Sequence, residues 1–223
     1  MIRMRKAERT RVRDILSKLK EVYGTEPWNW HTSQSPFRVL IATVLSQRTK
    51  DEKTDEAAQA LFAKYPSPRR IADAPLENLE DIIKSVNYYK TKARRIREIC
   101  QVLLKEHSGE VPESIDELLT LPGVGRKTAS CVMVYGFKKP AIAVDTHVHR
   151  ICNRTGIVHA KTARETEQKL WKIVPEEYIL YVNELMVKHG QEVCKPGKPL
   201  CFKCSITDLC KYEEEKNLKP GSA

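Results

Sequence analysis

The stretch "LPGVGRKTAS", residues 121–130, decides how the middle of this chain folds. It lies between two helix-like segments, "SIDELLTL" before it and "RKTASCVMVYGF" after it. Pro122 ends the first helix, and the glycines at positions 123 and 125 permit a tight turn with positive φ. The stretch therefore predicts a helix, a hairpin and a second helix.

The same hairpin has the features of a phosphate-binding turn. Because Gly123 and Gly125 have no side chains, their backbone N–H groups can approach a phosphate at the positive N-terminal end of the second helix. Arg126 and Lys127 follow directly and add two cations. A Walker loop requires glycine immediately before the lysine and a preceding strand, and this sequence has neither. Two interpretations fit this stretch. It is either an ordinary turn between two helices or a turn that binds the phosphate backbone of a nucleic acid without reading its bases.

The rest of the chain has helical periodicity, which predicts an all-α protein of about ten helices. Ser35-Pro36 and Ser67-Pro68 are helix starts, and the helix after Pro36 is apolar on nearly all sides, as a central buried helix would be. Asp145 precedes "THVHRICNRTG" as a helix N-cap. The one strand-like run, "AIAV" at 141–144, is too short to anchor a sheet.

The net charge of +10 over 223 residues favours a polyanionic partner, nucleic acid first and a membrane surface second. The basic N-terminus has no apolar signal-peptide core, and no window has the roughly eighteen apolar residues of a membrane span. We therefore expect a cytoplasmic protein without a membrane partner.

Four of the seven cysteines lie close together, at Cys194, Cys201, Cys204 and Cys210, whereas the other three lie in apolar helical patterns typical of core residues. In a cytosolic chain such a cluster favours a metal site over disulfides. Zinc sites more often use two close pairs, so a single close pair flanked by longer spacings favours a [4Fe–4S] cluster while leaving zinc open. Within the loop, Lys195 and Lys198 alternate with prolines and are candidates for phosphate contacts.

Together with "LPGVGRKTAS", the segment "AIAVDTHVHRICNRTG" and the array C-x6-C-x2-C-x5-C closely resemble the endonuclease III family of DNA repair glycosylases. The upstream segments "VLSQRTKDEKT" and "YYKTKARRI" extend the resemblance over nearly the whole chain. It implies two all-α domains with the active site in the cleft between them. Residues 31–139 would form a helical-barrel domain that carries the helix-hairpin-helix at 114–137. Residues 1–30 and 140–223 would form the iron–sulfur domain.

The resemblance assigns catalytic roles to Lys127 and Asp145. A lysine amine would attack sugar C1′, displace the damaged base and form a Schiff base, after which β-elimination would cleave the strand. Asp145 would stabilise the positive charge developing on the sugar or help to deprotonate the amine. The implied enzyme is a monomeric glycosylase and AP lyase for oxidised pyrimidines in damaged double-stranded DNA, associated with the nucleoid through that DNA.

The target base must leave the stack, and other residues must fill the gap. The family uses a glutamine and an apolar residue there. In this sequence Arg48 stands at the glutamine position, with Gln47 one residue earlier, and Tyr88 stands at the apolar position. Lys92 is a candidate phosphate contact, and a monovalent cation held by hairpin carbonyls is a family expectation. The departures from the family pattern at Arg48 and Tyr88 leave open which lesion the enzyme prefers.

Two alternatives remain at this point. One is a mismatch or oxidised-purine glycosylase of the same superfamily. The other is a DNA-binding protein without catalysis, in which the cysteine cluster has a structural role. The presence of both Lys127 and Asp145 at matching motif positions argues against the second.

Overall fold

The computed structural model describes residues 2–24 and 35–212, and it confirms the all-α prediction. These residues contain eleven α-helices, one π-helical turn and three short 3-10 turns, and no strand is found among them. The run at 141–144 is buried, but it has no regular secondary structure in the described chain. No helix in the described ranges is long and apolar enough to cross a membrane.

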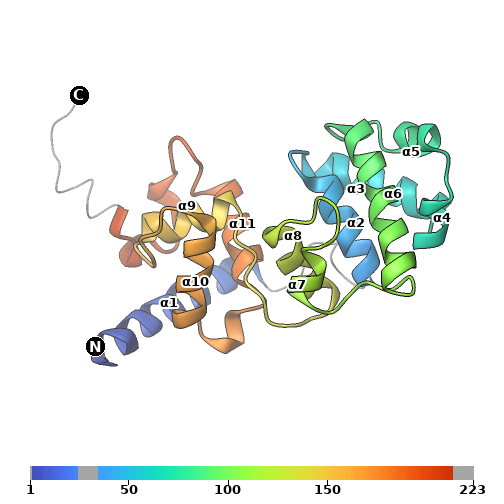
Figure 1. The fold of residues 1–223 in the computed structure, drawn as a ribbon. Coiled ribbons are helices and arrows are strands. Elements are labelled where there is room, and N and C mark those ends of the chain that lie inside the picture. Colours follow the sequence, from blue (N-terminus) through green and yellow to red (C-terminus); the bar gives the residue numbers. More distant parts are fainter. Residues whose placement is uncertain (1, 25–34, 213–223) are drawn as a thin grey trace. The chain divides into compact units, whose positions relative to one another are not determined.

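The chain divides into two compact units (Figure 1). We call described residues 35–141 the hairpin unit, and described residues 2–24 with 142–212 the cysteine unit. The second boundary lies between Ala141 and Ile142, close to the expected position after residue 139. The first expected boundary, after residue 30, lies outside the described residues.

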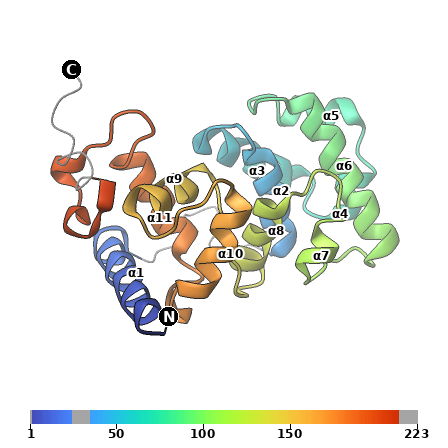
Figure 2. The ribbon, with the colours of Figure 1, turned by 60° about the vertical axis from the view of Figure 1, so that its left-hand side comes forward.

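The hairpin unit is built around α2 (Pro36–Ser46), whose residues 39–45 are all buried, as predicted for a central helix. Helix α2 contacts α3 (Asp51–Lys64), α6 (Tyr89–Glu106) and α8 (Arg126–Cys131), which are labelled in Figure 2. It also contacts the π-helical turn Val132–Gly136. The remaining helices of this unit are α4 (Pro68–Ala72), α5 (Leu76–Ile82) and α7 (Ile115–Leu118).

Serine caps start two helices of this unit as predicted. Ser35 Oγ accepts a hydrogen bond from the Arg38 N–H at 3.4 Å, and Ser67 Oγ accepts one from the Arg70 N–H at 3.4 Å. Each cap is followed by proline at the first helical position, where the missing N–H costs nothing. These local signals therefore specify the helix starts without help from tertiary contacts.

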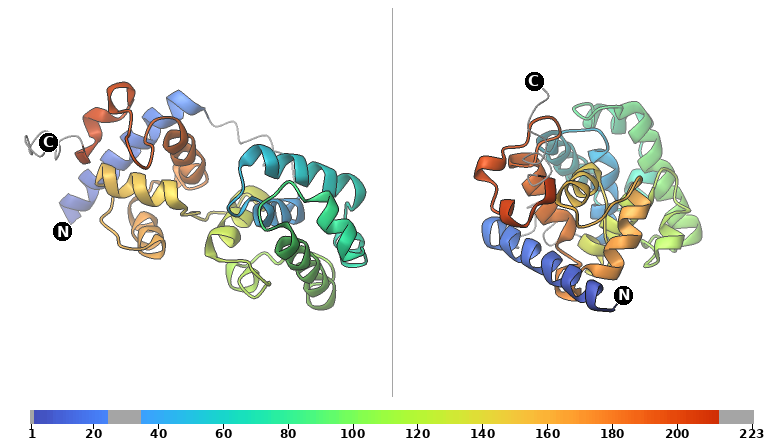
Figure 3. Two further views of the ribbon diagram at one scale, coloured as in Figure 1. Left: turned by 90° about the horizontal axis from the view of Figure 1, so that it is seen from above. Right: turned by 90° about the vertical axis from the view of Figure 1, so that its left-hand side faces the viewer.

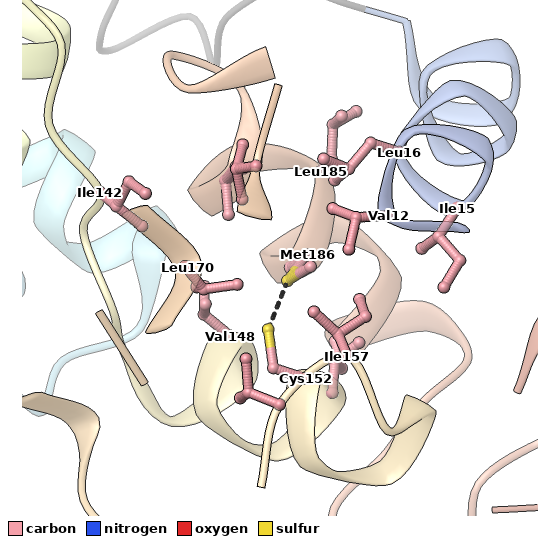
Figure 4. Close-up of a cluster of buried hydrophobic side chains, with 14 of the residues drawn as sticks. Val12, Ile15, Leu16, Ile142, Val148, Cys152, Ile157, Leu170, Leu185 and Met186 are labelled. Atoms are coloured by element: carbon pink, nitrogen blue, oxygen red, sulfur yellow. Dashed lines mark hydrogen bonds between the residues drawn. The ribbon is translucent and has the colours of Figure 1, made fainter. Parts of the chain in front are cut away.

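The cysteine unit consists of α1 (Ile2–Tyr23), α9 (Thr146–Thr155), α10 (Ala163–Ile173), α11 (Val182–Glu192) and the loop that follows. Although α1 and α11 are far apart in sequence, they pack directly against each other, and their arrangement is visible in Figure 3. Val12, Leu16 and Leu185 meet in one apolar core with Cys152 and Met186 (Figure 4). This core fixes the start of α9 and the beginning of the cysteine loop.

The Cys152 thiol lies 3.5 Å from the Met186 sulfur inside that core. Burial raises the pKa of this thiol above its ordinary value, so it remains protonated and apolar. Cys100 and Cys131 are likewise buried, in the hairpin unit. The prediction that these three cysteines are core residues is confirmed.

Candidate active site and cysteine cavity

The hairpin turn has one glycine in the left-handed conformation and one in an extended conformation. Gly123 has φ +72°, as predicted, and a Cβ added there would lie 2.7 Å from Arg95 Cδ. Gly125 has φ −92° and is the N-cap of α8, so the prediction of positive φ is wrong for this residue. Nothing lies within 4 Å of an added Cβ at Gly125. Gly123 is therefore required by the turn, whereas the turn itself tolerates a side chain at Gly125.

Lys127 is the second residue of α8 and is half-buried, while the next four residues of the helix are buried in the core. The lysine thus stands at the open N-terminal end of a helix that is anchored by its other residues. Arg126, beside it, is exposed. The side-chain amide of Gln47 donates to Gly123 O at 3.4 Å, so the end of α2 also touches the hairpin.

Asp145 is in the cysteine unit and is the N-cap of α9, as predicted. Its Oδ1 accepts a hydrogen bond from the Val148 N–H at 2.9 Å, and the side chain is half-buried. The segment before it is held by Asn183, whose side-chain N–H donates to Ala143 O at 2.8 Å. The cap uses one carboxylate oxygen, and the second oxygen, Oδ2, takes no part in it.

Arg48 and Tyr88 stand at two exposed turns of the hairpin unit, and both have left-handed backbones, with φ 55° and 58°. Tyr88 keeps 63% of its surface exposed. The two turns are joined, since the Asn87 side-chain N–H donates to Arg48 O at 2.5 Å and the Asn87 backbone N–H donates to Thr49 Oγ1 at 3.2 Å. The structure therefore brings together the two residues that the sequence predicted as gap fillers.

Lys92 does not have the phosphate-binding role predicted for it. Its side chain is only 5% exposed, and its Nζ donates to Leu45 O at 2.6 Å, Gln47 O at 2.7 Å and Thr49 Oγ1 at 2.8 Å. These contacts use all three N–H donors of the ammonium. Burial lowers the pKa of Lys92 to about 8. Lys92 is thus an internal cap at the C-terminal end of α2.

A periodicity signal for this burial was present in the sequence. Lys92 lies four residues before Ile96 and seven before Ile99, on the apolar stripe of α6. A lysine on such a stripe indicates an ammonium that needs internal acceptors. The acceptors themselves, at the end of α2, have no local sequence signal.

The four clustered cysteines line one cavity that is partly open to solvent. All four are half-buried. Within the described ranges, no three His, Cys, Asp or Glu side chains converge to hold a single metal ion. Four thiolate sulfurs around one cavity can hold either a [4Fe–4S] cluster or a single zinc ion.

Two arginines of α9 hold the first loop of the cysteine array. Arg154 donates to Lys195 O at 2.6 Å and to Pro196 O at 2.5 Å, and Arg150 Nη2 donates to Cys194 O at 2.8 Å. Arg154 Nη1 also lies 3.5 Å from the Cys194 sulfur. No local sequence pattern predicts these arginine contacts, which hold the loop in a fixed position.

The side chains of Lys195 and Lys198 are exposed on that loop, as expected for phosphate contacts. His189 also lines the cavity, and its Nε2 lies 3.7 Å from the Cys204 sulfur. Burial first, and the charge of Arg150 second, lower the pKa of His189 to about 4. A neutral imidazole therefore borders the cysteines at neutral pH.

Comparison with known proteins shows similarity in both sequence and fold. Residues 41–176 match the model of the HhH-GPD superfamily of base excision DNA repair proteins. Endonuclease III of Thermotoga maritima is 50% identical over 193 residues, which cover 86% of this chain and 90% of that protein.

Two solved structures are also similar. The structure of a trapped endonuclease III–DNA covalent intermediate has a TM-score of 0.86 and 36% identity, covering 94% of this chain and 98% of that one. A thermostable thymine-DNA glycosylase has a TM-score of 0.82 and 25% identity, covering 92% and 98%.

Proposed function

We propose that this chain, which belongs to the endonuclease III family of helix-hairpin-helix base excision DNA repair proteins, removes oxidised pyrimidines of the thymine-glycol type from duplex DNA. Membership of the family makes the chain a DNA glycosylase and AP lyase. The observation that carries the finer proposal is the position of Lys127, half-buried at the open end of α8 directly after the hairpin.

In this proposal Lys127 is the nucleophile. Its neutral amine attacks C1′ of the damaged nucleotide, a C–N bond forms, and the bond from C1′ to the base breaks. Loss of one amine proton and opening of the sugar ring, in which the ring oxygen takes up a proton, give a protonated Schiff base. Removal of a C2′ proton then expels the 3′ phosphate oxygen and cleaves the strand. The similar trapped endonuclease III–DNA covalent intermediate supports an enzyme–DNA bond in this chain.

Asp145 supplies the negative charge for the same step. The sugar becomes positively charged as the base departs, and a nearby carboxylate stabilises that charge. Because Oδ1 is used by the cap of α9, we assign this role to Oδ2. The cap bond and the Asn183 contact before it give the carboxylate a fixed direction.

The DNA backbone is held by the hairpin and by exposed cations. The backbone N–H groups of Gly123 and Gly125 bind phosphate, with Arg126 beside them. Lys195 and Lys198 provide further phosphate contacts from the cysteine loop. A monovalent cation bound to carbonyls of the hairpin would add positive charge at the same place.

Arg48 and Tyr88 fill the space that the extruded base leaves. The Arg48 guanidinium offers hydrogen bonds to the unpaired base on the opposite strand, and the Tyr88 ring offers a stacking surface. Their joined turns support this assignment. Gln47, whose amide touches the hairpin, lies next to Arg48 in the same turn.

We propose that Cys194, Cys201, Cys204 and Cys210 hold a [4Fe–4S] cluster. The cysteine spacing, one close pair flanked by longer intervals, supports this cluster over a single zinc ion, and all four thiols line one cavity. When bound, the cluster would supply iron–sulfur bonds that join the four cysteines, and with them the two ends of the loop, to one another. Arg150 and Arg154 orient the loop from outside, which keeps Lys195 and Lys198 turned to solvent.

A panel of defined duplexes tests the substrate class. Single-turnover excision is measured on thymine glycol, on 8-oxoguanine and on a G·T mismatch in the same flanking sequence. The proposal predicts the fastest excision for thymine glycol. Faster excision from the mismatch or the oxidised purine would contradict it and favour the other glycosylase class, a member of which, a thymine-DNA glycosylase, is among the similar structures.

A further inference from the structure

The buried ammonium of Lys92 lies where the C-terminal end of α2 meets the N-terminal end of α6. Its Nζ donates to Leu45 O in the last turn of α2, to Gln47 O at the C-cap of that helix, and to Thr49 Oγ1. Charged donors to carbonyls are stronger than neutral ones, and here they satisfy groups that a helix end leaves unpaired. Lys92, a residue of α6, therefore caps the C-terminal end of α2.

Lys92 also touches the second turn. Its backbone N–H donates to Tyr88 O at 3.0 Å, while its side chain bonds on both sides of Arg48, to Gln47 O and to Thr49 Oγ1. Thr49 Oγ1 in turn accepts from the Asn87 backbone N–H. The side chain of Lys92 thus holds the turn of Arg48, and Asn87 links that turn to the turn of Tyr88 through Thr49 Oγ1 and Arg48 O.

The two turns need such support. A non-glycine residue in the left-handed region costs on the order of 1 kcal/mol or more, and it persists only where surrounding contacts hold it. Both Arg48 and Tyr88 are in this region, and both are exposed, so their own side chains contribute little packing. Bonds to the neighbouring backbone are what hold the two turns in place.

Burying an ammonium is itself costly, and an apolar side chain of similar length would avoid that cost. With every donor used internally, the amine has no proton left for a phosphate and no exposure for attack on a sugar. Neither catalysis nor direct DNA binding therefore explains a lysine at this place. A role in fixing the geometry of the two turns explains why a lysine is found here.

We propose that Lys92 is a positioning residue that holds Arg48 and Tyr88 as one rigid pair for entry into the DNA at the lesion. This inference rests on the proposed function of Arg48 and Tyr88. Lys92 acts through them and not on the reacting atoms. Its loss therefore impairs base extrusion more than the chemistry of the lysine nucleophile.

The test compares a duplex that contains thymine glycol with a duplex that has a preformed abasic site. It is carried out in the wild-type protein and in the Arg48→Ala, Tyr88→Ala variant. Lys92→Met is measured for single-turnover excision of thymine glycol, for fluorescence of 2-aminopurine opposite the lesion, and for borohydride trapping on a duplex with a preformed abasic site. We expect excision and the fluorescence change to fall about 10-fold, and trapping to stay within about 2-fold. The control Lys105→Met removes an exposed lysine of the same helix and should change none of them.

A double-mutant cycle separates this inference from its premise. In the Arg48→Ala, Tyr88→Ala background, Lys92→Met should lower excision no further. An equal loss in both backgrounds, or no loss in the wild type, overturns the positioning role. Full excision by the Arg48→Ala, Tyr88→Ala variant alone instead contradicts the proposed function of those two residues, and the inference falls with it.

If Lys92→Met does not fold, Thr49→Val provides a second test of the proposal. It removes the acceptor shared by Lys92 and Asn87 while leaving the two α2 carbonyls to the ammonium. We expect a smaller loss in the same direction, about 3-fold in excision with unchanged trapping, again absent in the double-alanine background. Unchanged excision by a folded Thr49→Val variant, or a loss equal in both backgrounds, counts against the proposal.

Discussion

Asp145 and Val148 are joined by a hydrogen bond in which the Val148 N–H donates to Asp145 Oδ1 at 2.9 Å. The same carboxylate thus starts helix α9 and carries the charge assigned to the reaction. The two roles use different properties of the side chain, because the cap needs an oxygen acceptor whereas stabilisation of the sugar needs a negative charge.

Asparagine and alanine at this position therefore separate the roles. Asp145→Asn keeps an oxygen for the cap, so its free energy of unfolding should lie within about 0.5 kcal/mol of the wild-type value. Its rate of excision should fall at least about 100-fold, because the negative charge is lost. Asp145→Ala should lose similar activity and about 1 kcal/mol of stability as well. Denaturant unfolding and single-turnover kinetics measure the two effects. An Asp145→Asn variant with full excision would remove Asp145 from the catalytic step.

The two hairpin glycines should respond differently to alanine. Gly123→Ala forces a left-handed alanine against Arg95, and we expect a loss of stability of about 1–2 kcal/mol together with weaker DNA binding. Gly125→Ala meets no neighbour, so its stability should stay within about 0.5 kcal/mol of the wild type.

Binding of undamaged duplex at low salt then reports on the phosphate contact. If the Gly125 N–H approaches a phosphate closely, Gly125→Ala weakens this binding several-fold despite normal folding. Unchanged affinity would show that the phosphate does not come near Gly125. Thermal unfolding of both variants provides the comparison.

The buried Lys92 should make the stability of the protein depend on alkaline pH. Its pKa is lowered to about 8 in the folded chain from an ordinary 10.5, so between these values the unfolded chain binds more protons. The free energy of unfolding should therefore rise across this window, by on the order of 3 kcal/mol, and this gain is absent below pH 8. Lys92→Met should lack it. Parallel pH profiles of the two proteins would contradict the lowered pKa.

Loss of one cluster cysteine should remove iron and weaken the cysteine unit. We expect purified Cys204→Ala to contain little iron or acid-labile sulfide, to lack a brown colour and to unfold at a lower temperature. Cys100→Ala is the matched control, because that thiol is buried in the hairpin unit and should leave the iron content unchanged. Stoichiometric zinc without iron in the wild-type protein would replace the [4Fe–4S] assignment.

Local features of this fold were predictable from sequence. The serine and aspartate caps, the buried α2 and the turn at Gly123 each depend on residues within one or two helical turns. The extended conformation of Gly125 was not predicted, because glycine accepts both conformations.

The contacts that were missed join segments distant in sequence. Lys92 and its acceptors on α2 are separated by more than 40 residues, and so are Arg154 and the loop carbonyls that it binds. Residue type alone favoured a phosphate contact for Lys92, since most lysines are exposed. Only the packing of α6 against α2 shows that this one is enclosed.

Borohydride trapping on a duplex with an abasic site is the most direct test of the central claim that Lys127 is the nucleophile. The account predicts a covalent adduct with the wild-type protein, mapped by mass spectrometry to Lys127, and an undiminished adduct with the exposed-site control Lys105→Gln. Lys127→Gln should give none. A full yield of adduct with Lys127→Gln, or an adduct mapped to another lysine in the wild type, would contradict the account.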